Sequence, residues 1–184
     1  EAYAVDPVTE RRWRPGSELT AVRDSTGEVH ITAAPKKGRR SGAPRRVRGS
    51  GVARESAVGR EFQVSAGDFW QLHRAAPEVF AETVGRMAAV SPGGVAWDLY
   101  GGVGLFAAVL AEQAGPAGTV LLVESGHRAV DNAVRNLRDL PQVVFRGGRV
   151  EDVLVDRGPA VVAPHAARFL HQHDFFDDHS PVVG

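Results

Sequence analysis

The pattern of hydrophobic and polar positions divides the chain into a β-rich first part and a larger α/β part. Near the amino terminus, two runs with apolar residues at strand spacing, 18–23 and 29–33, flank Asp-Ser-Thr-Gly at 24–27, which predicts a β-hairpin. Another strand is predicted at 61–64. The segment 35–51 has few apolar residues and many Gly, Pro and Arg, so we expect a solvated loop there.

Beyond this loop, helical periodicity and short apolar runs alternate. The expected helices are 69–90, 105–114 and 128–140, and the expected strands begin at Val95, at Thr119, at Val143 and at Pro159. Strands that alternate with helices indicate a parallel α/β sheet of Rossmann type, covering about 93–163. We therefore divide the chain into a β-rich segment 1–60, an α/β domain 61–163 and an irregular tail 164–184.

A glycine turn with two acids is the most informative local feature. Asp98 ends the first expected strand, and the sequence Leu-Tyr-Gly-Gly-Val-Gly follows it up to Gly104. Gly102 and Gly104 would let the backbone approach a ligand with no Cβ in the way. Glu124 ends the next strand, where a carboxylate can accept both hydroxyls of a ribose. Strand, glycine turn, helix, strand and acid together predict a nucleoside cofactor site.

The turn also bears on which cofactor binds. The dinucleotide pattern G-x-G-x-x-G has its third position at Ala107, a permitted variant, so NAD stays open. A pyrophosphate favours a bare turn at a helix N-terminus. Here Asp98 and Tyr100 precede the glycines, and a carboxylate suits the cationic methionine end of S-adenosylmethionine better. We expect S-adenosylmethionine in preference to NAD; the third alternative is a structural βαβ unit without ligand.

Composition narrows the chemistry further. The 184 residues contain 22 basic and 22 acidic residues and no cysteine, which excludes disulfides, thiolate metal sites and a cysteine nucleophile within this chain. No apolar run approaches the roughly 20 residues of a membrane span, so we expect a cytoplasmic protein that does not bind membranes. The tail residues His171, His173 and Asp174 are expected to be incidental, and we predict no metal site. Nothing in the sequence indicates an oligomeric state.

Three segments in order resemble the RNA 5-methyluridine methyltransferases, a class I family that uses S-adenosylmethionine. They are Phe69-Trp-Gln71, the glycine turn from Asp98 to Gly104 with Phe106, and Val120-Leu-Leu-Val-Glu124. An Asn-Ala-x-x-Asn element at 132–136 follows, and the match covers roughly 55–155. The resemblance implies that Gln71 contacts the methionine part of the donor, that Tyr100 lines the same pocket and that Glu124 holds the ribose.

The resemblance also implies an RNA partner, tRNA or rRNA, methylated at uracil C5. The basic segment from Lys36 to Arg48 fits phosphate binding, although a solvated charged loop has the same composition.

The chain departs from the family at the catalytic step. The family's cysteine adds to uracil C6 so that C5 can accept the methyl group. This chain has no cysteine, and position 105, often polar in the family, is Leu. We assign no catalytic residue and expect only the donor-binding part of such an enzyme. The alternatives are another class I methyltransferase acting on a small molecule or protein, and a non-catalytic fragment.

Overall fold

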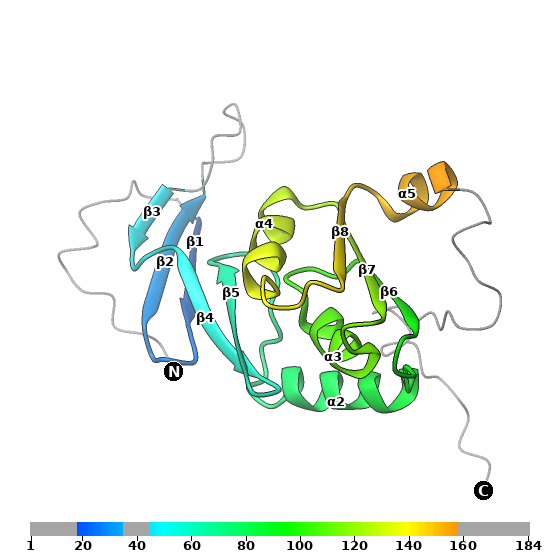
Figure 1. Cartoon of the computed structure of the whole chain (residues 1–184). Helices are drawn as coiled ribbons and strands as arrows, with labels where there is room; N and C mark the ends of the chain where they lie inside the picture. Colours follow the sequence, from blue (N-terminus) through cyan, green and yellow to red (C-terminus); the bar gives the residue numbers. More distant parts are fainter. Residues whose placement is uncertain (1–17, 35–44, 158–184) are drawn as a thin grey trace, which may run out of the picture. The chain divides into compact units, whose positions relative to one another are not determined.

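The structure is a computed structural model that describes residues 18–34 and 45–157 (Figure 1). The chain forms two compact units: the first consists of Glu1–Ser56 and Glu61–Trp70, the second of Ala57–Arg60 and Gln71–Gly184. The boundary that we expected between residues 60 and 61 falls inside the strand Arg60–Ser65, whose first residue belongs to the second unit and whose other residues belong to the first. The expected strand at 159–163, the tail 164–184 and the basic residues at 36–40 lie outside the described residues.

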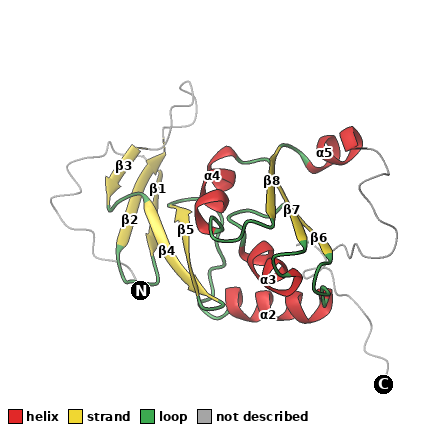
Figure 2. Cartoon of the chain, viewed as in Figure 1, coloured by secondary structure: helices red, strands yellow, loops and turns green. Residues whose placement is uncertain are grey.

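The described elements of the first unit are all strands (Figure 2). One sheet has the order β1-β2-β3, and a two-stranded sheet pairs β4 with β5. The bounds are β1 (Glu18–Arg23), β2 (Val29–Ala34), β3 (Arg45–Arg48), β4 (Val52–Ala57) and β5 (Arg60–Ser65). The predicted hairpin is confirmed, since β1 and β2 pair antiparallel around the turn at 24–27. The strand β4 was not predicted.

The predicted loop 35–51 is wrong for its last part, because residues 45–48 form β3 and pair antiparallel with β2. A single apolar residue explains the error. Val47 is buried against Ile31 and Ala33 of β2, whereas the three arginines of the strand are exposed. One buried side chain is enough to fix a short edge strand, although the composition of the segment is that of a solvated loop.

The second unit contains a parallel sheet with the order β6-β7-β8 (Figure 1). Its elements are α2 (Ala76–Ala88), β6 (Val95–Leu99), α3 (Leu105–Ala114), β7 (Thr119–Glu124), α4 (His127–Asn136), β8 (Val143–Gly147) and α5 (Val150–Arg157). The expected strands at 95, 119 and 143 and the helix 105–114 are confirmed. None of the helices in the described part of the chain is long and apolar enough to cross a membrane.

Small residues let α3 pack closely on this sheet. Ala107, Ala108 and Ala111 of the helix are fully buried, and α3 contacts β6, β7 and α2. Successive strand residues point to opposite faces, so Trp97 joins an apolar cluster with Leu121, whereas Asp98 faces α3. The alternation thus turns one acid of β6 toward the helix that begins at the glycine turn.

Two helices are shorter than predicted, for local reasons. The helix expected at 69–90 begins only at Ala76, where Pro77 occupies the first turn, and it ends before Ala89, whose φ of 43° is left-handed. The helix expected at 128–140 ends at Asn136, because Leu137 leaves helical geometry and is buried in the core.

Candidate functional site

The carboxyl ends of β6 and β7 bring two acidic residues onto neighbouring strands. In the parallel register Leu99 lies beside Val123, so Asp98 precedes this pair and Glu124 follows it. The negative charge of Glu124 contributes to raising the pKa of Asp98, as expected for carboxylates close together. The prediction that these two acids lie at the ends of adjacent strands is confirmed.

Asp98 supports the start of α3. Its carboxylate is only 5% exposed, and Oδ2 accepts a hydrogen bond of 2.8 Å from the backbone N–H of Ala107 in the first turn of the helix. The residue at the N-cap position, Gly104, has no side chain that could accept such a bond. An anion at a helix N-terminus is also favoured by the helix dipole. Asp98 therefore couples the strand to the glycine turn and the helix.

Burial governs the protonation of Asp98. Desolvation raises the pKa of this carboxyl from 3.8 to about 7; the bond from Ala107 opposes the shift and the charge of Glu124 adds to it. Near neutral pH the side chain thus lies close to its titration midpoint. A cationic ligand near Asp98 would favour the ionised form, because an opposite charge lowers the pKa of a carboxyl group.

Glu124 ties together the two loops that follow β6 and β7. Oε2 accepts a bond of 3.0 Å from the N–H of Gly102, and Oε1 accepts one of 2.7 Å from the N–H of Gly126. The Ser125 hydroxyl lies 3.4 Å from Oε1. A carboxylate offers about four acceptor positions, so Oε2 retains one for a hydroxyl donor, and Oε1 gains a second if the long contact from Ser125 is displaced.

The positions of the turn require glycine for different structural reasons. A Cβ on Gly104 would lie 2.7 Å from Leu137, and one on Gly101 would lie 2.6 Å from Leu122, so both positions need glycine for packing. A Cβ on Gly102 would meet nothing within 4 Å, although its φ of 54° is left-handed. Gly102 is therefore the position of the turn where the backbone faces open space.

Tyr100 occupies an unfavourable backbone conformation at this edge. Its φ of 63° is left-handed, which is uncommon for a residue with a bulky side chain, and the residue is 38% exposed. The hydroxyl hydrogen-bonds the carboxylate of Glu151, at the start of α5. Strained residues of this kind cluster at ligand sites, although the surrounding structure must enforce them.

Gln71 lies in the segment before α2 and is half-buried. No hydrogen bond among the described residues links it to Asp98, Tyr100 or Glu124. The structure thus brings together the two acids and the glycine turn by direct contacts, and it leaves Gln71 outside this network.

One supporting residue of the site has no predicted role. Asn136, the last residue of α4, is buried and donates a bond of 3.0 Å from Nδ2 to the carbonyl of Val103. It therefore holds the glycine turn from the helix that follows β7. The Asn-Ala-x-x-Asn spacing marked the position in the sequence, but only the fold reveals the contact with Val103.

The arrangement can hold a nucleoside by its ribose and a cation beside it. Its acceptors are carboxylates at strand ends, and the only open backbone position of the turn lies next to them. Among the described residues, the one group of three potential metal ligands lies in the first unit.

Comparison with known proteins gives relatives along most of the chain. The sequence is 39% identical over 145 residues to an uncharacterized RNA methyltransferase of Streptomyces avermitilis, which covers 79% of this chain and 33% of that protein. It is 36% identical over 169 residues to one of Bifidobacterium longum, covering 85% of this chain and 38% of that protein. The chain thus spans little more than a third of these relatives. No protein-family model matches it.

Solved structures identify the fold. The tRNA (uracil-54, C5)-methyltransferase of Pyrococcus abyssi, in complex with S-adenosyl-L-homocysteine, superposes with a TM-score of 0.54 at 18% identity and covers 70% of this chain and 38% of that one. Trm5b of the same organism gives a TM-score of 0.50 at 19% identity, covering 70% and 36% of the two chains. The α/β part of the chain has the Rossmann-like methyltransferase fold, as the sequence predicted.

Proposed function

We propose that the chain belongs to a family of RNA methyltransferases and that its second unit is the part that binds the methyl donor, S-adenosylmethionine. The chain is then a donor-binding portion of an enzyme that methylates RNA. It contains no cysteine, so it does not itself supply the thiolate that adds to uracil. We expect no uridine methylation by these 184 residues alone.

One observation carries the proposal. The Glu124 carboxylate is held at the end of β7 by backbone N–H groups from two loops, beside the one glycine of the turn that faces open space. An oriented carboxylate next to bare backbone suits the two hydroxyls and the sugar of a nucleoside. We propose that Glu124 binds the ribose hydroxyls. We also propose that the nucleoside packs against the backbone of Gly102.

We assign the other residues of the site to parts of the donor by their charge and shape. We assign Asp98 to the cationic methionine end, because its carboxylate is buried nearby and would be ionised by a cation. Tyr100 would line the same pocket, and Gly104 would keep α3 close to the site. Gln71 would contact the methionine part of the donor.

The RNA substrate is the second part of the proposal. Names of relatives in sequence support RNA, and the fold of a tRNA uracil C5-methyltransferase supports a uridine of tRNA or rRNA as the target. The basic segment from Lys36 to Arg48 would neutralise phosphates; its described arginines, Arg45, Arg46 and Arg48, are exposed on β3. The reaction would take place in the cytoplasm.

Calorimetry with S-adenosylmethionine, S-adenosylhomocysteine and NADH tests the donor site. We expect both adenosyl ligands to bind and NADH not to bind. Glu124→Ala should weaken donor binding by about 1–3 kcal/mol, because two ribose hydroxyls lose their acceptor. The matched control is Glu82→Ala, an exposed acid of α2 that should leave affinity unchanged. Tighter binding of NADH, or unchanged affinity of Glu124→Ala, would contradict the assignment.

Titration with labelled RNA separates the alternatives. Donor binding together with RNA binding that weakens when Arg45, Arg46 and Arg48 are replaced by Gln supports the proposal. Donor binding without RNA affinity would favour a methyltransferase with a small-molecule or protein substrate. Binding of neither would indicate a non-catalytic fragment.

A further inference from the structure

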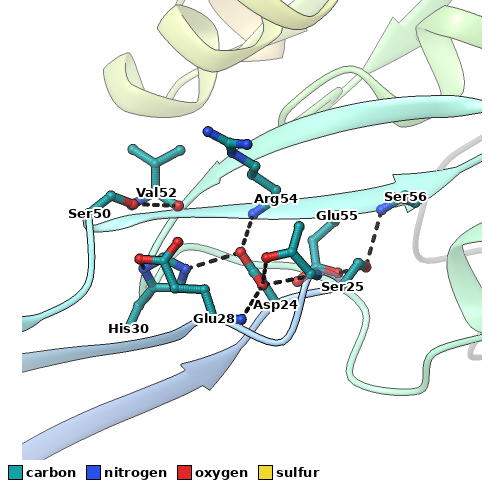
Figure 3. A network of polar contacts seen from close by, with 10 residues as sticks. Asp24, Ser25, Glu28, His30, Ser50, Val52, Arg54, Glu55 and Ser56 are labelled. Atoms are coloured by element: carbon teal, nitrogen blue, oxygen red, sulfur yellow. Dashed lines mark hydrogen bonds and ion pairs between the residues drawn. The ribbon is translucent and has the colours of Figure 1, made fainter.

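A buried carboxylate organises the β1–β2 turn of the first unit (Figure 3). Oδ1 of Asp24 accepts bonds from the N–H of Thr26 at 3.0 Å, from its hydroxyl at 2.7 Å and from the N–H of Glu28 at 2.9 Å. Oδ2 accepts from the N–H of Arg54 at 3.0 Å and lies 3.2 Å from Nε2 of His30. Five partners occupy both oxygens, so Asp24 has little capacity left for a direct ligand.

The contact with Asp24 assigns a role to each ring nitrogen of His30. Because Oδ2 of Asp24 is an acceptor, Nε2–H of His30 donates a hydrogen bond to it. In the neutral ring the other nitrogen, Nδ1, then carries a lone pair.

Nδ1 of His30 is an acceptor without a donor. The side chain is 0% exposed, and Nδ1 has no hydrogen-bond partner among the described residues. Oε1 of Glu28 lies 4.0 Å from Nδ1. Two acceptors that face each other in this way are stabilised when a cation, a proton or a bridging water lies between them.

Gly49 packs against the edge of the ring at this point. A Cβ on Gly49 would lie 2.5 Å from Nδ1 and 2.9 Å from the carbonyl oxygen of Val29, so any other residue would press on the ring. The φ of Gly49, 76°, is also left-handed. The side of the ring that carries the lone pair is thus bordered by a bare backbone, a carbonyl oxygen and a half-exposed carboxylate.

We propose that Nδ1 of His30 and the carboxylate of Glu28 bind a divalent transition-metal ion such as Zn²⁺. Asp24 orients the ring by accepting a hydrogen bond from the other ring nitrogen, Nε2. A carboxylate that takes the second N–H of a metal-binding histidine is the usual outer partner in such sites. Imidazole nitrogen and carboxylate oxygen are suitable zinc ligands, and water completes the coordination.

The distance between the two ligand atoms fits an ion. Zinc bonds of about 2.0–2.2 Å to nitrogen and oxygen would span about 4.1 Å end to end, close to the 4.0 Å between Nδ1 and Oε1. A tetrahedral angle brings the two atoms to about 3.4 Å, so Glu28 must move inward by roughly 0.6 Å. Its side chain is 49% exposed and free to do so. The ion would lock the start of β2 onto a turn that Asp24 ties to β4.

The experiment must exclude the histidines of the tail, because His171 and His173 could bind zinc in any conformation. We therefore use the full chain with His171→Gln and His173→Gln, stripped with chelator, and titrate Zn²⁺ while recording the melting temperature. We expect a rise of roughly 5–10 °C at about ten times the dissociation constant. Glu28→Gln in this background should weaken zinc binding at least tenfold.

The matched control is Glu61→Gln, an exposed acid of β5, which should keep the full zinc effect. Nitrogen NMR of His30 gives a second readout that does not depend on stability: Nδ1 should be unprotonated without metal and should shift on addition of Zn²⁺. An equal zinc effect in Glu28→Gln, or a doubly protonated ring that Zn²⁺ leaves unchanged, would overturn the proposal. Neither result bears on donor binding by the second unit.

Discussion

Each of the two units buries an aspartate at or next to the end of a strand, and the two carboxyl groups have opposite pKa shifts. Asp24 has five hydrogen-bond partners, and its pKa is lowered. Asp98 accepts one bond among the described residues, from Ala107, and its pKa is raised to about 7. Burial acts in the same direction on both, so the number of donors decides the sign. The carboxylate of Asp24, whose acceptor positions are all occupied, stabilises a turn. The carboxyl group of Asp98 has few partners and remains available to a cation.

The largest expected effect is that of removing Asp24. Asp24→Ala leaves the N–H groups of Thr26, Glu28 and Arg54 without their acceptor inside the first unit, and it also removes the partner of His30. We expect a loss of about 3–5 kcal/mol in the free energy of unfolding of this unit, as for broken buried polar networks. Urea unfolding followed by residue-resolved NMR measures it. Glu61→Ala is the control, and a loss below about 1 kcal/mol would show that water replaces the network.

The opposite pKa shifts predict opposite responses to pH. Asp98 binds its proton more tightly in the folded state, so the stability of the second unit should fall as pH rises from about 4 to about 7. Three pKa units correspond to roughly 4 kcal/mol at most. Asp24 contributes stability above its unfolded pKa of 3.8, and this contribution is lost as pH falls below about 4.

Residue-resolved unfolding at pH 3, 5 and 7.5 distinguishes the two units. Asp98→Asn keeps an oxygen acceptor for the N–H of Ala107 and removes the titratable group. The stability of the second unit in this variant should therefore no longer depend on pH between 4 and 7. If both units respond to pH with the same sign, the contrast between the two aspartates is wrong.

Two glycines of the same turn allow a finer comparison within the second unit. Gly104→Ala forces a Cβ against Leu137 at a left-handed φ of 94°, and we expect a loss of about 2–4 kcal/mol in stability. Gly102→Ala meets no atom and should cost only about 1 kcal/mol, from its backbone conformation. Thermal melts measure both. If Gly102→Ala nevertheless abolishes donor binding at a temperature where it is folded, the open space beside Gly102 belongs to the ligand. Unchanged donor affinity would remove this position from the site.

The sequence predicts the second unit better than the first, for reasons that individual residues show. Apolar runs and the glycine turn define β6, α3 and β7, because buried parallel strands and a buried helix have strong patterns. In β3 a single buried residue, Val47, decides the structure among exposed arginines, and no compositional rule detects it.

The candidate site shows the same limit. Spacing alone predicts that Asp98 and Glu124 lie on neighbouring strand ends, since parallel strands in sequence order often pair. The capping of α3 by Asp98 depends on how closely this helix packs on β6, and the packing of Gly104 depends on Leu137, which follows α4. The pairing of Asp24 with Arg54 joins residues 30 positions apart, so no local pattern predicts it.

The central claim is that the carboxyl ends of β6 and β7 bind an adenosyl donor, and an amide NMR titration with S-adenosylhomocysteine tests it most directly. The account predicts saturable shifts of the Gly102 and Gly126 amides, whose hydrogen bonds to Glu124 must adjust when the ribose binds. Gly27 and Gly59, at the turns of the β-hairpins, should not shift. Absence of shifts at Gly102 and Gly126, or the same shifts with NADH, would contradict it.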